Sequence, residues 1–245
     1  MIKANMKYLF IVLLALFSVT LTAQQAEHSA LQELYQDVLH PADPLLNGRE
    51  YGYYFQPRVS TPLIPEEPYP PASVLIRQKL YSNVMLLYDT YKDVVVYYNP
   101  GNLSHNVPAS IIVNRQIIEE FTLNLPSGQS RFRYFSFTED MEGMLNDGFY
   151  EIVSEGACKF IIKHSAVKKV QDGAVVYQYK PERYLISQGA VYRIRGKKSL
   201  LEALSDRAAE VKEYLKRTKI QVGTADKEQL KGVLDYYTVL KQAGG

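Results

Sequence analysis

The chain has 245 residues, of which 47% are hydrophobic and 22% are charged, and it contains a single cysteine. A chain of this length can bury a large core without disulfides, while one cysteine excludes an intrachain disulfide and a cysteine-based zinc site. The formal net charge is only +2, and no nucleic-acid partner is predicted.

Residues 1–23 have the order of a cleavable signal peptide. Lys3 and Lys7 form a positive region, residues 8–19 are almost entirely apolar, and small residues lead to a cut after Ala23. The alternative is a retained anchor, but the apolar run is shorter than the ~20 residues of a spanning helix. We therefore expect a periplasmic or outer-membrane-associated protein. It is not expected to be a lipoprotein, since no cysteine follows the cut.

Residues 24–72 are predicted to form an N-terminal helix and a proline-rich arm. Apolar residues recur at helical spacing in 26–39, and eight prolines lie between positions 41 and 73. Proline cannot donate to a sheet ladder, so most of this stretch is expected to be loop, with edge strands at most in 51–55 and 59–64.

Residues 73–196 are predicted to form an antiparallel β domain, because short runs rich in valine, leucine and tyrosine alternate with turn residues. Turns are expected at 81–83, at 89–93 and at Gln188-Gly189. Cys158 lies in a largely apolar stretch, where we expect a buried, inert thiol. The predicted strands are 74–81, 83–89, 93–98, 111–114, 117–123, 131–137, 149–153, 159–164, 175–180, 184–187 and 191–195.

Residues 197–245 are predicted to form a two-helix segment, with helices near 199–218 and 226–241. Ser199 and Glu202 have the spacing of a capping box at the start of the first helix. Each helix carries one apolar stripe, the first running from Leu201 to Leu215 and the second from Leu230 to Leu240. The predicted fold class is therefore α+β, an antiparallel β-rich domain followed by a C-terminal helical hairpin.

Motifs that carry catalysis or hold a cofactor are absent from the sequence. The four histidines lack the spacing of a zinc protease, and there is no Gly-x-Ser-x-Gly elbow, phosphate loop or dinucleotide fingerprint. No catalytic, cofactor-binding or metal-ligating residue is predicted, and no cofactor.

Two features of the composition stand out, the uneven distribution of charge along the chain and the abundance of tyrosine. Residues 24–157 contain 17 acidic and 8 basic residues, whereas residues 158–245 contain 9 acidic and 18 basic residues. A basic end of this kind either forms solvated surface or attracts an anionic partner, which would be another envelope protein or an anionic surface.

Twenty tyrosines against no tryptophan add candidate contact residues, because tyrosine joins an apolar face to a polar tip. The basic end includes Lys168 and Lys169 as well as the segment around position 195. The candidate contact residues are Arg193, Arg195, Lys197, Lys198, Tyr53, Tyr97 and Tyr177.

Four segments carry a resemblance to a known group. They read LNGREY at 46–51, YSNVMLLYD at 81–89, GFYEIV at 148–153 and KKSLL at 197–201. In this order they resemble a group of uncharacterised exported proteins of Bacteroidota-type bacteria, over roughly residues 45–240. The resemblance implies an exported location and a shared fold, and it carries no assigned activity and no functional residues.

Two classes of function are consistent with the sequence. The first is a non-catalytic cell-envelope binding module or accessory subunit that acts by contact. The alternative is an extracytoplasmic hydrolase whose catalytic residues are dispersed along the chain. A deep pocket with converging carboxylates, or a histidine with a carboxylate partner, would favour the hydrolase, and a flat tyrosine-rich face would favour the binding module.

Overall fold

The computed structural model describes residues 43–52, 54, 59–65, 70–104, 107–126, 128–137 and 145–243. The predicted signal peptide, the predicted helix at 26–39 and Tyr53 lie outside these residues. The chain divides into two units, Met1–Asn47 and Gly48–Gly245. In the first unit, residues 43–47 form a turn in which the Leu45 N–H donates to the Asp43 carboxylate at 2.9 Å.

The second unit contains every helix and strand of the described chain, and all its strand pairs are antiparallel, as predicted. Its large sheet has the order β1-β6-β5-β4-β3-β7-β8-β9-β10-β13-β14, with β2 paired to β4. The strands of this sheet are β1 (Arg49–Glu50), β2 (Leu63–Ile64), β3 (Pro71–Ile76), β4 (Lys79–Asp89), β5 (Val94–Ser104), β6 (Val107–Ile112), β7 (Ile118–Leu125), β8 (Gly128–Phe135), β9 (Gly148–Glu155), β10 (Lys159–Lys163), β13 (Glu182–Ser187) and β14 (Ala190–Arg193).

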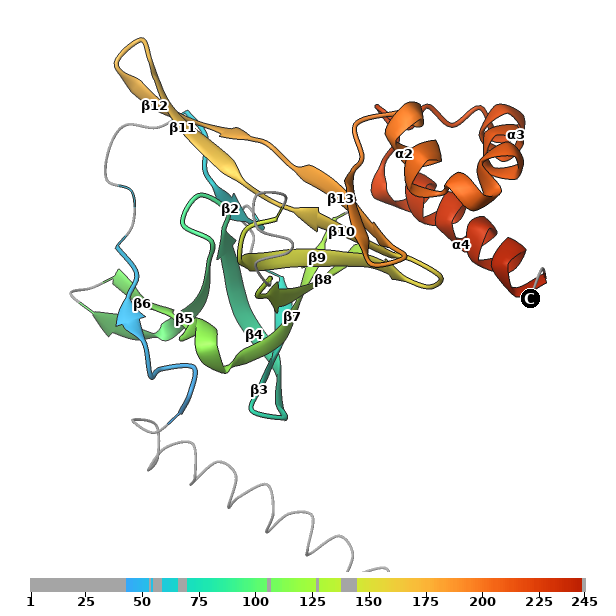
Figure 1. The fold of residues 1–245 in the computed structure, drawn as a ribbon. Helices are drawn as coiled ribbons and strands as arrows, with labels where there is room; N and C mark the ends of the chain where they lie inside the picture. Colours follow the sequence, from blue (N-terminus) through green and yellow to red (C-terminus); the bar gives the residue numbers. More distant parts are fainter. Residues whose placement is uncertain are drawn as a thin grey trace, which may run out of the picture. The chain divides into compact units, whose positions relative to one another are not determined.

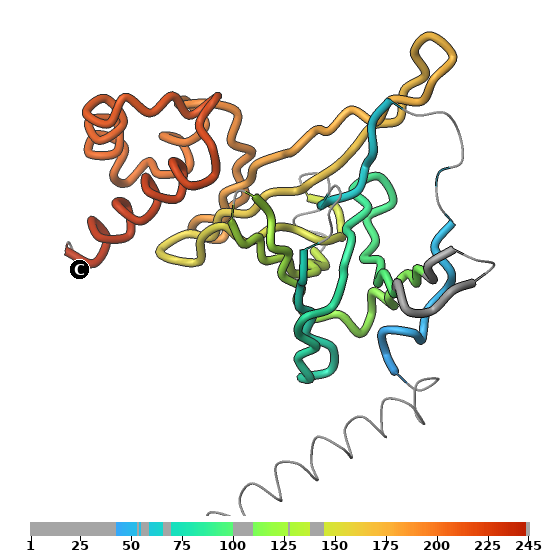
Figure 2. Tube along the Cα trace, turned by 180° about the vertical axis from the view of Figure 1, so that it is seen from behind, coloured from blue at the N-terminus to red at the C-terminus, as the bar shows by residue number. Residues whose placement is uncertain are grey.

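A separate two-stranded ribbon consists of β11 (Ala166–Gln171) and β12 (Ala174–Tyr179). It lies in the chain between β10 and β13, and its turn lies far from the C-terminal helices (Figures 1 and 2). Strand β11 was not predicted, because all but one of its residues are exposed and its sequence has little apolar periodicity.

Three hairpin turns have the same backbone conformation, in which two consecutive residues lie in the left-handed region. They are Arg77-Gln78, Asp172-Gly173 and the predicted Gln188-Gly189. Such turns match the right-handed twist of the flanking strands. The predicted turn at 81–83 is wrong: Asn83, with φ of 59°, is instead a bulge residue within β4, where the register with β3 shifts.

The C-terminal segment contains α2 (Lys197–Ala203), α3 (Ala208–Thr218) and α4 (Lys227–Ala243), with a 3-10 turn, Ser205–Arg207, between the first two. The predicted helix at 199–218 is therefore broken in its first half. Among the described residues, no helix is both long and apolar enough to cross a membrane.

The capping prediction for the first helix is also wrong. Ser199 lies within the first turn of α2, where its hydroxyl accepts the backbone N–H groups of Arg195 and Gly196 at 3.0 and 3.2 Å. A capping box is found instead at α4. There the Asp226 carboxylate accepts the Gln229 N–H at 2.8 Å, and the Gln229 side chain accepts the Asp226 N–H at 3.2 Å.

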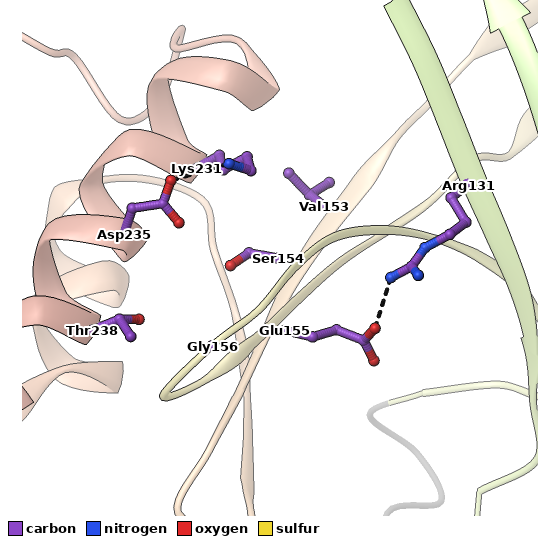
Figure 3. A pocket seen from close by; sticks show the side chains of 8 residues that line it. All are labelled: Arg131, Val153, Ser154, Glu155, Gly156, Lys231, Asp235 and Thr238. Atoms are coloured by element: carbon purple, nitrogen blue, oxygen red, sulfur yellow. Dashed lines mark hydrogen bonds and ion pairs between the residues drawn. The ribbon is translucent and has the colours of Figure 1, made fainter. Parts of the chain in front are cut away.

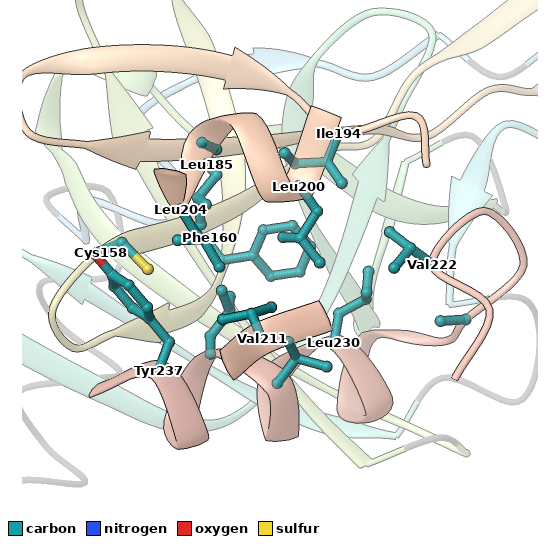
Figure 4. Packing of buried hydrophobic residues seen from close by; sticks show 14 of the residues in the cluster. Cys158, Phe160, Leu185, Ile194, Leu200, Leu204, Val211, Val222, Leu230 and Tyr237 are labelled. Atoms are coloured by element: carbon teal, nitrogen blue, oxygen red, sulfur yellow. The ribbon is translucent and has the colours of Figure 1, made fainter. Parts of the chain in front are cut away.

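Among the described residues, one hydrophobic cluster joins these helices to the sheet (Figure 4). Phe160 and Ile162 of β10 point to the helices, while Ile161 between them packs on the opposite face, as strand alternation requires. Val211 of α3 and Val233 of α4 are fully buried against this strand face. Both predicted apolar stripes therefore face the core.

Candidate functional site

The basic segment between β14 and α2 is exposed. Arg193, Arg195, Lys197 and Lys198 all lie at the surface, and buried Ile194 separates the two arginines. Arg193 pairs with Glu182 of β13. Within the described part of the chain, the side chains of Arg195, Lys197 and Lys198 form no ion pair.

Two of these cations occupy an unfavourable position. Lys197 and Lys198 are the first two residues of α2, whose first turn contains no acidic residue. The N-terminus of a helix carries a partial positive charge, so each lysine is repelled by about 0.3–1 kcal/mol at an exposed site. Among the described residues, no ion pair of either lysine offsets this repulsion.

The structure does not gather all the predicted basic residues together. Lys168 and Lys169 are on β11, in the ribbon at the far end of this unit from α2 (Figures 1 and 2). The basic contact surface is therefore restricted to the β14–α2 segment, defined as residues 193–198.

The three tyrosines predicted as contact residues differ in their exposure. Tyr177 is only 5% exposed, and its ring packs against those of Tyr54 and Tyr91 at centroid distances of 5.0 and 5.4 Å. It is a core residue, so its prediction as a contact residue is wrong. Tyr97 of β5 is half-buried, and Tyr53 lies outside the described residues.

The hydroxyls of Tyr51 and Tyr54 meet at a buried carboxylate. Asp89, fully buried at the end of β4, accepts the hydroxyls of Tyr51 and Tyr54 at 2.8 and 2.6 Å. It also accepts the N–H groups of Tyr91 and Lys92 at 2.9 and 3.0 Å. These four hydrogen bonds satisfy the carboxylate. The Asp89 cluster therefore has a structural role, holding the end of β4 to the neighbouring loop.

A second buried cluster contains the side chains that enzymes use. Glu151 of β9 contacts Nε2 of His164 at 2.8 Å and accepts from Nζ of Lys227 at 2.6 Å. Lys227 also donates to the Ser130 hydroxyl at 2.8 Å, and Nδ1 of His164 lies 2.5 Å from the Tyr179 hydroxyl. Strands β8, β9 and β12, the residue that follows β10 and the start of α4 thus share one polar network.

The electrostatics of this network keep Glu151 ionised. Burial alone raises its pKa, but hydrogen bonds from His164, Lys227 and Ser130, with the charge of His164, outweigh burial and lower the pKa to about 2. Burial, with the nearby Glu151 charge, raises the pKa of Tyr179 to about 12. Ser130 is only 1% exposed, so its hydroxyl is closed to a substrate.

Sequence reasoning missed this network because its members come from distant positions in the chain. One feature of the sequence did indicate a buried charge. Glu151 stands in the middle of the apolar run Phe149-Tyr150-Glu151-Ile152-Val153, and a charge within a buried strand requires a partner.

A hollow of about 420 Å³ lies beside α4 (Figure 3). Arg131 of β8 and Glu155 of β9 form one wall, and Lys231 and Asp235 of α4 form the other. The Glu151 network does not line this hollow. Ser154, with Val153, lies between the two walls.

No group of three or more histidine, cysteine, aspartate or glutamate side chains is placed to hold a metal in the described ranges. Comparison of the chain with protein families, curated proteins and solved structures finds no match. Function therefore has to be inferred from the sites themselves.

Proposed function

We propose that the protein is a non-catalytic binding module or accessory subunit of the cell envelope. It acts through contact of the β14–α2 segment with an anionic partner, either another envelope protein or an anionic surface. The observation that carries the proposal is the position of Lys197 and Lys198 at the start of α2, exposed and without an acidic neighbour in the first turn.

The physical reason is that these charges oppose the stability of their own helix. Natural proteins are rarely optimised for stability, and destabilising surface cations are retained where a function needs them. Arg195 adds a third cation two residues before the helix, also without an ion pair among the described residues. An anionic partner would relieve the repulsion among the three charges.

The location in the cell envelope rests on the signal-peptide pattern of residues 1–23. Mature protein recovered from cells is expected to begin at or near Gln24 and to carry no lipid. Intact-mass measurement checks this, and a retained Met1 or Met6 would contradict it.

Reversal of the three charges tests the contact. The variant Arg195→Glu/Lys197→Glu/Lys198→Glu should lose binding to phosphatidylglycerol vesicles if the partner is an anionic surface. If the partner is a protein, the variant should lose the crosslinked species that the wild type forms in intact cells. Binding of the wild type should weaken as salt rises, because exposed charges are screened within about 8–10 Å.

The matched control is Arg49→Glu/Arg77→Glu/Lys79→Glu, which makes the same change in net charge in the acidic part of the chain. This control should retain binding. If both triple variants bind like the wild type at every salt concentration, the β14–α2 segment is only solvated surface and the proposal fails.

One observation favours the alternative, a hydrolase: the Glu151–His164 pair is a histidine with a carboxylate partner. Its burial and its contacts with Lys227 and Tyr179 argue for a structural role. An assay with fluorogenic ester and peptide substrates distinguishes a hydrolase from a structural role of this pair. Turnover that disappears in His164→Gln would establish the hydrolase.

A further inference from the structure

The hollow beside α4 has two walls that face each other, and each wall carries one cation and one anion (Figure 3). On the strand side Arg131 pairs with Glu155 at 2.7 Å, and on the helix side Lys231 pairs with Asp235 at 3.0 Å. These side chains are between 31% and 55% exposed. Exposed pairs of this kind are weak, so a ligand charge can replace one partner with little loss.

Arg131 is the cation on the strand side of the hollow, and its Nε also lies 3.8 Å from a carboxylate oxygen of Glu120. Its partner Glu155 is also held by Arg133 at 3.3 Å and by Lys159 at 3.5 Å. These neighbouring charges lower the pKa of Glu155 against the effect of its partial burial. Glu155 therefore remains paired when Arg131 moves to a ligand carboxylate.

Between the walls, one polar group lacks a partner. Ser154 is 9% exposed, and its hydroxyl points toward α4 in the hollow (Figure 3). Among the residues that the structure describes, none forms a hydrogen bond with this hydroxyl, and its oxygen is open to solvent. A hydroxyl that is open to solvent exchanges its water for a ligand amide or carbonyl.

The remaining side chains that line the hollow include Thr238, which is held by hydrogen bonds, and the apolar Val153. The Thr238 hydroxyl accepts the Ala157 N–H at 3.2 Å and donates to the Leu234 carbonyl at 2.9 Å, which fastens α4 to the turn between β9 and β10. The apolar side chain of Val153 is beside Ser154 and offers contact to a short aliphatic group. The hollow, of about 420 Å³, opens broadly to solvent and has room for a small polar ligand.

We propose that this hollow binds a small zwitterion, an amino acid or a short peptide. The ligand carboxylate contacts Arg131, the ligand ammonium contacts Asp235, and the Ser154 hydroxyl binds the group between them. This site is separate from the basic β14–α2 segment. Its test therefore does not depend on whether that segment binds an anionic partner.

Titration of the full mature protein with glycylglycine tests the site, followed by isotope-edited NMR of the backbone amides. Saturable shifts are expected at Ser154, Gly156 and Lys231. N-acetyl-glycylglycine lacks the ammonium and glycylglycine amide lacks the carboxylate, so each should bind about tenfold more weakly or worse.

The informative variants are Ser154→Ala, Asp235→Asn and Arg131→Gln, each expected to raise the Kd for glycylglycine about tenfold. Ser154→Ala removes no hydrogen bond within the described chain, so the variant should fold. The matched controls, Asp172→Asn on the ribbon and Lys212→Gln on α3, should bind like the wild type. Absence of saturable shifts, equal binding of the three peptides or unchanged binding by Ser154→Ala would overturn the proposal.

Discussion

Nζ of Lys227 lies 2.6 Å from Oε1 of Glu151, which joins the first turn of α4 to the middle of β9. The side chains are 17% and 4% exposed, so the pair is largely removed from water. A buried pair of this kind contributes modestly as a whole, but loss of one partner leaves the other charge uncompensated.

Removal of the lysine should therefore be strongly destabilising. Lys227→Met is expected to lower the free energy of unfolding by about 3 kcal/mol, measured by urea denaturation at neutral pH. The control is Lys231→Met, one turn further along α4, whose pair with Asp235 is exposed and should contribute less than about 1 kcal/mol. Equal losses in the two variants would show that Glu151 does not depend on Lys227.

Glu151 should also make stability depend on acidity. Its pKa falls from an ordinary value of 4.5 to about 2 in the folded chain. A carboxyl group with a lowered pKa stabilises the fold above its unfolded pKa, and the contribution disappears as pH falls through the folded pKa. Between pH 5 and pH 2, the unfolding free energy of the wild type should fall by about 3 kcal/mol more than that of Glu151→Gln. Parallel acid profiles for the two proteins would contradict this.

The lone thiol should be unreactive in the folded protein. Cys158 is 4% exposed in the core beneath the helices, and burial, with the nearby Asp206 charge, raises its pKa to about 12. At pH 8 a thiol-specific reagent such as dithionitrobenzoate should label almost none of the native protein and all of the urea-unfolded chain. Rapid labelling without denaturant would show that this core opens readily.

Gly156 should be intolerant of even one added carbon. A Cβ at this position would lie 2.6 Å from the Thr238 hydroxyl oxygen. Gly156→Ala should therefore displace Thr238, break its bond with the Ala157 N–H and destabilise the protein by about 1–3 kcal/mol.

Two comparisons isolate this contact. Gly52→Ala places its Cβ in open space and should be nearly neutral. In a Thr238→Ala background the Gly156 substitution should be less damaging by about 1 kcal/mol, which a double-mutant cycle measures. A loss that is the same in both backgrounds would locate the strain elsewhere.

The sequence was most informative where patterns are local. Alternation of apolar and polar residues predicted the antiparallel strands, and helical spacing placed Val211 and Val233 on buried faces. Turn chemistry was less reliable, because Asn83 can adopt a left-handed conformation in a bulge as readily as in a turn.

The candidate sites depend on contacts that no local pattern contains. Tyr177 has the residue type of a contact surface, yet Tyr54 and Tyr91 from other parts of the chain cover it. Likewise, Glu151 and Lys227 are 76 residues apart, and only the docking of α4 brings them together. Exposure of Arg195 and its neighbours could be predicted, since their charges are not matched within the local sequence.

The shared core under α2, α3 and α4 has a consequence for the order in which the chain can mature. The strands are synthesised before the helices, but Phe160 and Leu185 are covered, and Glu151 meets Lys227, only when the helices arrive. Until then, these strands present an apolar face to water and a charged group without its lysine. A chain emerging from a membrane channel or a ribosome therefore completes this core only after α4 has emerged, and truncation near residue 196 would remove the cover of the sheet rather than a detachable tail.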